Sequence, residues 1–333
     1  MDRLLIGGTN WLGDSIMSMP ALQTLKQHQP GTHISLLVKP GMVLLWEMHE
    51  AIDAIVPIYQ GSGGTRLTVR ALRRQSFDRA VLFPNSFRSA LLPFLGGVPR
   101  RIGVAAHGRR LLLTDARRGR PSDDLPHQFR EYYRLLDMEV PTEPVAPRIT
   151  PPDSARGEAE LLLSDATDRP WVAMLPGAAR GNSKRWPPEC FAEVAKQLVE
   201  DLGVRIALFG TAVEQAACDH IAGVVGDSAR NLAGKTSLVL LAAALGRCRA
   251  ALSNDSGGMH LATALNVPVV ALFGLTDPAL TGPIGASHRV ICGAPPEQRT
   301  RDVPRESAEA EAALRCITPE RVLAEVRAML ETS

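Results

Sequence analysis

Short apolar runs alternate with helix-like segments along almost the whole chain, and each run is followed by a turn of small or polar residues. In the first half, strands are expected at 4–7, 34–38, 54–58 and 80–83, with helices at 15–27 and 67–74. In the second half, strands are expected at 172–175, 205–209, 249–252 and 269–273, with helices at 188–201, 213–224, 237–245, 259–265 and 319–331. Repeated strand–helix–strand units form parallel sheets covered by helices, so the pattern predicts an α/β protein.

A proline-rich segment divides this pattern in two. Five prolines lie between residues 141 and 152, which is typical of a linker. A length of 333 residues also suits two domains better than one. We therefore expect domains at 1–150 and 151–333, with their parallel sheets facing a central cleft. The last helix, 319–331, is placed where it can cross back onto the first domain, although spacing alone does not decide this.

Composition narrows the class of protein. The chain is 45% hydrophobic and 22% charged, which is typical of a soluble globular protein. Its five cysteines are scattered without a CxxC pair, which argues for a reducing compartment and against a disulfide framework or a zinc site. Neither a signal peptide nor an apolar run of ~20 residues is present. We expect a cytoplasmic protein.

Positive charge is concentrated in one segment. Residues 61–120 hold 13 arginines and no lysine against Asp78 and Asp115, an excess of +11 in a chain whose net charge is +2. A solvated basic surface is one interpretation. Arginine in preference to lysine also indicates fork-shaped recognition of phosphate or carboxylate. Without an aromatic-rich recognition motif, nucleic acid is disfavoured, and an anionic substrate or an anionic membrane surface fits better.

The segment Ser253-Asn254-Asp255-Ser256-Gly257-Gly258-Met259-His260 joins an expected strand to an expected helix. Such a turn leaves free backbone N–H groups at the positive end of a helix dipole, which favours a phosphate. Asp255 and His260 flank this seat and can hold hydroxyls or a second phosphate. The alternative is that Asp255 only caps the helix and the glycines only make the turn. The segment alone leaves both interpretations open.

Two other turns follow expected strands. The first, 7–14, lacks the GxGxxG spacing, and no acidic residue closes the following strand, so a nicotinamide cofactor is disfavoured. It ends at Asp14, which is either a helix N-cap or a general base. The second, 175–187, carries Arg180 and Lys184, which can neutralise a phosphate, and Trp186-Pro187, which can fix the loop before a helix.

Four motifs in order resemble the ADP-heptose:lipopolysaccharide heptosyltransferases, glycosyltransferase family 9. They are Trp11-Leu12-Gly13-Asp14, Pro84-Asn85-Ser86-Phe87-Arg88-Ser89-Ala90, Lys184-Arg185-Trp186-Pro187 and Asn254-Asp255-Ser256-Gly257 with Met259-His260. The resemblance runs nearly end to end, and residues 81–115 and the turn at Trp11 are most similar to the family's second inner-core enzymes. The family's first inner-core enzymes carry hydroxyl side chains where this chain has Ala178-Ala179. This difference also favours the second inner-core enzymes, and it removes two possible hydrogen-bond donors to a phosphate.

This resemblance implies a GT-B architecture of two Rossmann-like domains, with the acceptor on the first, the nucleotide sugar on the second, inversion at the anomeric carbon and no metal. The chain also shows no DxD pair and no His/Cys cluster. No cofactor is expected, and ADP-heptose is expected to act as the donor substrate.

Roles follow for individual residues. Asp14 is expected to be the base, and Lys184 with the N–H groups of Ser256 and Gly257 to hold the departing diphosphate. Asp255 is expected to bind heptose hydroxyls and His260 the phosphate, within a donor-binding turn that includes Gly258 and Met259. By family analogy, Glu214 binds the ribose.

The acceptor is expected on the first domain. Asn85, Arg88 and Arg66 are its expected contacts, and phosphate recognition is assigned to several of Arg66, Arg70, Arg73, Arg88, Arg100 and Arg109. The expected partners are ADP-L-glycero-D-manno-heptose, the heptose of a lipid-linked lipopolysaccharide inner core, and the inner face of the inner membrane.

Two other classes remain open. One is another nucleotide-sugar enzyme of this fold, either a transferase for a different sugar or a 2-epimerase. The other is a non-catalytic protein that binds a nucleotide sugar. A requirement for a lipid acceptor separates transfer from epimerisation.

Overall fold

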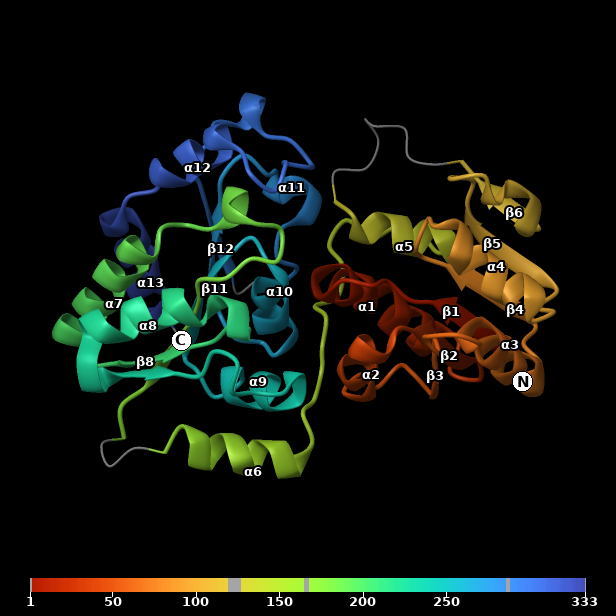
Figure 1. Ribbon diagram of the computed structural model, residues 1–333, viewed down its shortest axis with the longest axis horizontal. Helices are drawn as coiled ribbons and strands as arrows, with labels where there is room; N and C mark the ends of the chain where they lie inside the picture. Colours follow the sequence, from red (N-terminus) through yellow and green to blue (C-terminus); the bar gives the residue numbers. More distant parts are fainter. Residues whose placement is uncertain (1, 119–126, 165–167, 286–287, 333) are drawn as a thin grey trace. The chain divides into compact units, whose positions relative to one another are not determined.

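The computed structural model describes residues 2–118, 127–164, 168–285 and 288–332. The chain divides into two compact units, Met1–Thr150 and Pro151–Ser333, and the division falls in the proline-rich segment. Each unit is built around its own parallel sheet (Figure 1). Among the described residues, no helix combines the length and the apolar character needed to cross a bilayer.

The first unit holds a six-stranded parallel sheet in the order β3-β2-β1-β4-β5-β6. Its strands are β1 (Arg3–Gly7), β2 (His33–Val38), β3 (Ala54–Pro57), β4 (Arg79–Leu82), β5 (Arg100–Val104) and β6 (Asp115–Arg117). Its helices are α1 (Leu12–His28), α2 (Pro40–Glu47), α3 (Gly64–Gln75), α4 (Phe87–Leu95), the 3-10 turn η1 (Arg109–Leu112) and α5 (Phe129–Leu135). Leu72 of α3 and Leu92 of α4 share one core with Leu5 and Leu82 of the sheet, so α3 and α4 cover the same face.

The second unit repeats this plan in the order β12-β11-β10-β7-β8-β9, again all parallel. Its strands are β7 (Trp171–Leu175), β8 (Arg205–Leu208), β9 (Ala229–Asn231), β10 (Ala250–Asn254), β11 (Val269–Phe273) and β12 (His288–Cys292). Its α-helices are α6 (Asp153–Leu162), α7 (Pro188–Leu202), α8 (Gln215–Val225), α9 (Leu238–Leu245), α10 (Gly257–Ala264), α11 (Pro278–Thr281), α12 (Ala308–Arg315) and α13 (Pro319–Thr332). Its 3-10 turns are η2 (Asn182–Lys184), η3 (Ala212–Glu214), η4 (Gly226–Ser228) and η5 (Pro296–Gln298).

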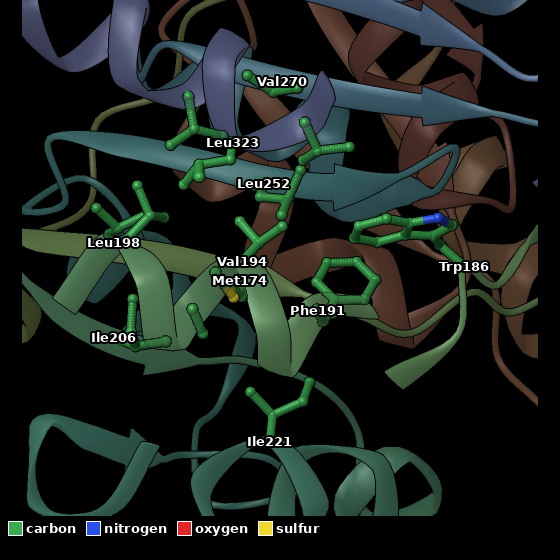
Figure 2. Packing of buried hydrophobic residues seen from close by; sticks show 14 of the residues in the cluster. Met174, Trp186, Phe191, Val194, Leu198, Ile206, Ile221, Leu252, Val270 and Leu323 are labelled. Atoms are coloured by element: carbon green, nitrogen blue, oxygen red, sulfur yellow. The ribbon is translucent and has the colours of Figure 1, made fainter. Parts of the chain in front are cut away.

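A large apolar core holds the second unit together (Figure 2). Trp186 and Phe191 meet edge to face with ring centroids 5.1 Å apart, and both are completely buried. Each large apolar side chain buried in this way stabilises the fold by roughly 1.5–3 kcal/mol. Val322 and Leu323 of α13 belong to the same core. The buried face of α13 is thus used inside the second unit, whereas the sequence left open that this helix returns to the first.

The α/β class predicted from the sequence is confirmed. Both sheets have the strand order of doubly wound nucleotide-binding folds, in which the order reverses once. The reversal lies between β1 and β4 in the first unit and between β7 and β10 in the second. The strands that the sequence did not predict, β5, β6, β9 and β12, occupy outer positions beyond these central pairs.

Candidate active site

The residues predicted to act in function follow the central strands of the two sheets. Where strand order reverses, the carboxyl ends of two neighbouring strands leave a place for a ligand. Asp14 and Asn85 come after β1 and β4, which pair in parallel. Lys184 and Asp255 come after β7 and β10, which also pair in parallel. These four predicted residues therefore gather at two such positions, one in each unit, whereas Glu214 follows β8 and Arg66 lies on α3.

Lys184 and Asp255 form an ion pair between Nζ and Oδ2, although they are 71 positions apart in the sequence. The two side chains are only 12% and 7% exposed. Removing one member of a nearly enclosed pair leaves an uncompensated charge, so the two residues depend on each other. The sequence placed both residues in turns after expected strands but did not predict that they bind each other.

Thr276 holds the same carboxylate from the loop after β11. It is buried, and its Oγ1 donates a hydrogen bond to Asp255 Oδ2 at 2.7 Å. Within the described part of the chain no residue hydrogen-bonds to the other oxygen, Oδ1, so the carboxylate keeps one oxygen for a ligand. Sequence reasoning missed Thr276, because a threonine in a loop after a strand carries no local signal of this contact.

Asn254 closes the loop that carries Lys184. Its Nδ2 donates to the carbonyl of Pro176 at 2.7 Å, and its Oδ1 accepts from the backbone N–H of Trp186 at 3.1 Å. One buried amide thus ties the two ends of this loop together. Trp186 is anchored in turn, since its Nε1 donates to the carbonyl of Ile317 at 3.0 Å. The predicted role of Trp186 in fixing the loop is confirmed.

The outer side of the same loop is held by residues 302–306. Arg180 pairs with Asp302 at 2.8 Å, and the backbone N–H of Ser183 donates to the carbonyl of Arg305 at 3.3 Å. Arg180, which the sequence offered as a phosphate ligand, is therefore already neutralised by Asp302. Lys184 is the cation of this loop that lies beside Asp255.

The turn before α10 supplies backbone donors. Ser256 is the N-cap of α10 and makes no side-chain capping bond, and the first N–H groups of a helix have no partner within it. Gly258 allows close packing, since a Cβ there would lie 2.5 Å from Leu175 Cδ2. The alternative that Asp255 caps α10 is wrong, because Asp255 precedes the N-cap and its carboxylate is engaged in the ion pair.

Met259 and His260 lie deeper in α10 than the rest of this turn. The side chain of Met259 is completely buried and that of His260 nearly so. Ser256, Gly257 and Gly258 are each partly exposed. A ligand at this helix end therefore has the backbone of these three residues available at the surface.

Glu214 lies against the loop after β7. Its Oε2 accepts from the backbone N–H of Thr211 at 2.6 Å and from the Thr211 hydroxyl at 2.9 Å. The position of a Cβ on Gly177 is occupied by this carboxylate, so the two loops meet closely there. The structure thus brings Glu214, in a capping box of η3, to the loop that carries Lys184.

Asp14 lies in the first turn of α1. Trp11 is the N-cap and makes no side-chain capping bond, so Asp14 occupies the third helical position. The interpretation of Asp14 as the N-cap is therefore wrong. Gln128 Nε2 donates to Asp14 Oδ1 at 3.1 Å and to the hydroxyl of Tyr132 at 2.8 Å. Gln128, at the N-cap of α5, was missed because 114 positions separate it from Asp14.

Arg109 is a buried support for the acceptor loop. Its side chain is completely buried and donates to the carbonyl of Val104 at 2.7 Å, to Ser89 Oγ at 2.9 Å and to Asn85 Oδ1 at 3.1 Å. It also donates to the carbonyl of Pro84. Burial lowers the pKa of Arg109 to about 10, so it stays charged at neutral pH. Its expected role in binding an acceptor phosphate is wrong, because every arm of the guanidinium is used inside the protein.

The other arginines of the predicted acceptor set, Arg66, Arg70, Arg73, Arg88 and Arg100, are all exposed. Arg66 of α3 and Arg88 of α4 are exposed and lie on helices that cover the same face of the sheet. Arg73 donates through Nε to the carbonyl of Leu95 at 3.0 Å. Arg66 and Arg88 are the two of this set that lie in the first turns of their helices. Among the described residues, no group of three or more histidine, cysteine or acidic side chains has the arrangement to hold a metal ion.

Comparison with known proteins gives consistent matches. The family model of glycosyltransferase family 9 (heptosyltransferase) matches residues 65–312. Lipopolysaccharide heptosyltransferase 2 of Salmonella typhimurium is 34% identical and that of Escherichia coli 33% identical, each over 98% of both chains. A solved structure of E. coli ADP-heptose lps heptosyltransferase II superposes with a TM-score of 0.86 at 32% identity, covering 100% of this chain and 99% of that one.

Proposed function

Because the chain belongs to glycosyltransferase family 9, the heptosyltransferases, we propose that it transfers heptose from ADP-L-glycero-D-manno-heptose to the heptose of the lipopolysaccharide inner core. It is an enzyme of lipopolysaccharide core synthesis, and similarity over nearly the full length to heptosyltransferases 2 supports the second transfer. The observation that carries the mechanism is the Lys184–Asp255 pair beside the start of α10.

The donor binds to the second unit in this account. Lys184 exchanges Asp255 for the diphosphate, and the N–H groups of Ser256 and Gly257 complete the anion site at the positive end of the α10 dipole. Thr276 still holds Asp255 when Lys184 moves, and the remaining oxygen accepts from heptose hydroxyls. Glu214 accepts from the ribose hydroxyls, and the nearly buried His260 supports the phosphate from within α10.

Transfer is a single displacement with inversion. The acceptor oxygen forms a bond to the anomeric carbon while the bond from that carbon to the phosphate oxygen breaks. Asp14 takes the proton of the acceptor hydroxyl, and ADP leaves with the electron pair of the broken bond. Negative charge grows on the leaving diphosphate, and Lys184 with the α10 N–H groups stabilises it electrostatically. Fixed positive charge of this kind supplies the stabilisation that a metal supplies in other transferases.

The acceptor binds to the first unit. Asn85 is held in place by Arg109 at 3.1 Å, while Arg66 and Arg88 are free of that support role and exposed. Their guanidinium groups suit the phosphates of a lipid-linked inner core. Since this acceptor is anchored in a bilayer, the enzyme works on the cytoplasmic side as a peripheral protein of the inner membrane.

A donor and acceptor assay tests this function. ADP release from ADP-heptose is measured with and without a lipid-free inner-core acceptor that ends in heptose. We expect ADP release only with acceptor, an inverted anomeric linkage by NMR, and an unchanged rate in EDTA. Turnover of the nucleotide sugar without acceptor would instead indicate an epimerase, and binding without turnover would indicate a non-catalytic protein. A faster reaction with another nucleotide sugar would identify a transferase for a different sugar.

A further inference from the structure

The helical layer on one face of the first sheet presents arginines and apolar side chains together on its outer surface. We define this outer face by Leu67, Arg70 and Arg74 of α3, Phe94 of α4, and Arg110 and Leu111 of η1, all of which are exposed. Helices α3 and α4 both belong to the first unit (Figure 1) and contact each other. None of these six side chains is used in the proposed chemistry.

The three elements form one continuous surface. Arg73 of α3 donates to the carbonyl of Leu95 at the end of α4 at 3.0 Å. Arg101 lies over the ring of Phe94, 5.3 Å from its centroid, and donates through Nε to the carbonyl of Leu112 at 2.7 Å. The first contact joins α3 to α4, and the second joins α4 to η1. The exposed side chains are therefore parts of a single face.

Leu111 is displayed on a rigid support. It is 91% exposed, the most exposed of the large apolar side chains in the described part of the chain. Yet Arg109 before it is completely buried, and Leu113 after it is 8% exposed. The turn is thus pinned on both sides while Leu111 projects outward. A single exposed leucine is ordinary, but here Leu67, at 50%, and Phe94, at 43%, share the same face.

The positive charge of the outer face is not neutralised by acidic residues of the surrounding segment, 61–120. Asp78 and Asp115 are the only acids in residues 61–120. Asp78 accepts from the backbone N–H of Arg3 at 2.7 Å, and Asp115 pairs with Arg117 at 2.8 Å. Arg70, Arg74 and Arg110 on α3 and η1 therefore present their charges outward. Arginines around projecting apolar side chains match a surface that carries phosphates above hydrocarbon.

We propose that the outer face docks the first unit on an anionic lipid bilayer. Leu111, Phe94 and Leu67 enter the boundary between headgroups and acyl chains, and Arg70, Arg74 and Arg110 bind lipid phosphates. This inference rests on the proposed function, because docking holds the acceptor-binding unit at the surface in which a lipid-linked acceptor is anchored. It adds lipid-binding side chains beyond the acceptor contacts Asn85, Arg66 and Arg88, of which Arg66 lies one helical turn before Arg70 on α3.

Vesicle binding tests the proposal without acceptor. The full chain is sedimented with vesicles of phosphatidylcholine alone or mixed with phosphatidylglycerol. We expect binding only to the mixed vesicles, and weaker binding as salt rises. Leu111→Ser should weaken binding roughly tenfold, as expected for one leucine withdrawn from an apolar boundary. The double variant Arg74→Gln/Arg110→Gln should weaken it by about fivefold for each arginine.

Matched controls lie on the second unit. Leu161 is 76% exposed on α6, and Arg249 is exposed, so Leu161→Ser and Arg249→Gln make the same chemical changes away from the outer face. Both should bind vesicles as the wild type does. Equal losses from the controls, or no binding of the wild type to phosphatidylglycerol vesicles, would overturn the proposal. An altered oligomeric state of Leu111→Ser with unchanged vesicle binding would show that another copy of the chain covers this face.

The kinetics separate this proposal from the proposed function. With a lipid-free acceptor, Leu111→Ser should transfer heptose at the wild-type rate. With acceptor embedded in mixed vesicles, its rate at limiting enzyme should fall in proportion to the lost binding. If the wild type fails to transfer to the lipid-free acceptor, the proposed function fails. If it transfers normally but does not bind vesicles, only the docking inference fails.

Discussion

Lys184 and Asp255 bind each other at the carboxyl edge of the second sheet, with both side chains almost enclosed by protein. The lysine thus lies beside the start of α10, where we propose that backbone N–H groups bind the diphosphate. Asp255 does not depend on this lysine alone, since Thr276 donates to the same oxygen at 2.7 Å. We therefore propose that Lys184 can leave Asp255 for the diphosphate while Thr276 keeps the carboxylate in place.

Replacing Lys184 by glutamine should reduce both stability and transfer. Asp255 then lies nearly buried without its cation, and we expect the second unit to lose about 3–5 kcal/mol in urea unfolding. The surface pair Lys196–Glu200 offers a control, because its side chains are 57% and 59% exposed. Lys196→Gln should cost less than about 0.5 kcal/mol. Similar losses from the two variants would show that the enclosed pair has no special role in folding.

Thr276 should strengthen donor binding because its hydroxyl holds the Asp255 carboxylate in place. Thr276→Val keeps the shape of the side chain but removes a hydrogen bond to a charged group, which contributes about 1.5–3 kcal/mol. We expect the Michaelis constant for ADP-heptose to rise roughly tenfold or more, with acceptor kinetics unchanged. Thr276→Ser restores the hydroxyl and should recover the donor constant. An unchanged Michaelis constant for ADP-heptose in Thr276→Val would show that the hydrogen bond to Asp255 does not contribute to donor binding.

Replacing Arg109 should reduce the stability of the first unit more than it reduces binding of the anionic acceptor. Arg109→Lys keeps a positive charge but cannot make the separate bonds to Val104, Ser89 and Asn85. We expect the first unit to lose roughly 2–4 kcal/mol, as when a buried hydrogen-bond network is broken. Thermal unfolding with and without about 0.5 M salt measures this loss of stability. At that concentration the interactions of surface charges are screened beyond about 5 Å. An unchanged melting temperature with a salt-sensitive loss of acceptor binding would restore Arg109 as a phosphate ligand.

His49 should make the first unit less stable in acid. Burial lowers the pKa of His49 from 6.5 to about 4, so the folded state holds the neutral form while the unfolded state takes up a proton. The free energy of unfolding should therefore fall as pH drops from about 6.5 to about 4, by about 3 kcal/mol in total. Urea unfolding at pH 7 and pH 5 measures this slope. His49→Gln should flatten it, and an equal slope in that variant would assign the effect to other groups.

Much of the fold follows from local patterns. The central strands β1, β4, β7, β10 and β11 were predicted because each is a continuous apolar run with a turn after it. The outer strands were harder. Strand β5 begins with Arg100-Arg101 and β6 is only Asp115–Arg117, so neither resembles a buried strand. They become strands because a neighbour offers free backbone groups along its edge.

Local patterns predict only part of the candidate site. The residues in turns after central strands, Asp14, Lys184 and Asp255, carry a local signal, since ligands bind at the ends of such strands. Their partners carry none. Gln128 and Thr276 contact the site only because the chain folds back over 114 and 21 positions, respectively. Local sequence preferences also do not predict where α1 begins, since its N-cap is Trp11, a residue type that is not favoured at an N-cap.

Asp14 is the residue on which the catalytic mechanism depends most. It occupies the third position of α1 and accepts a hydrogen bond from Gln128 at 3.1 Å. Asparagine in its place still offers an oxygen to Gln128 but cannot take a proton. Asp14→Asn should therefore fold and bind ADP as the wild type does, while losing general-base catalysis.

The most direct measurement is turnover of Asp14→Asn at saturating ADP-heptose and saturating lipid-free acceptor. Loss of a general base typically lowers the rate on the order of 10²–10⁴-fold. We expect a rate at least about a hundredfold below the wild type, with unchanged ADP affinity and unfolding. A rate close to that of the wild type would contradict the account, because Asp14 would then be only a residue of the first helical turn.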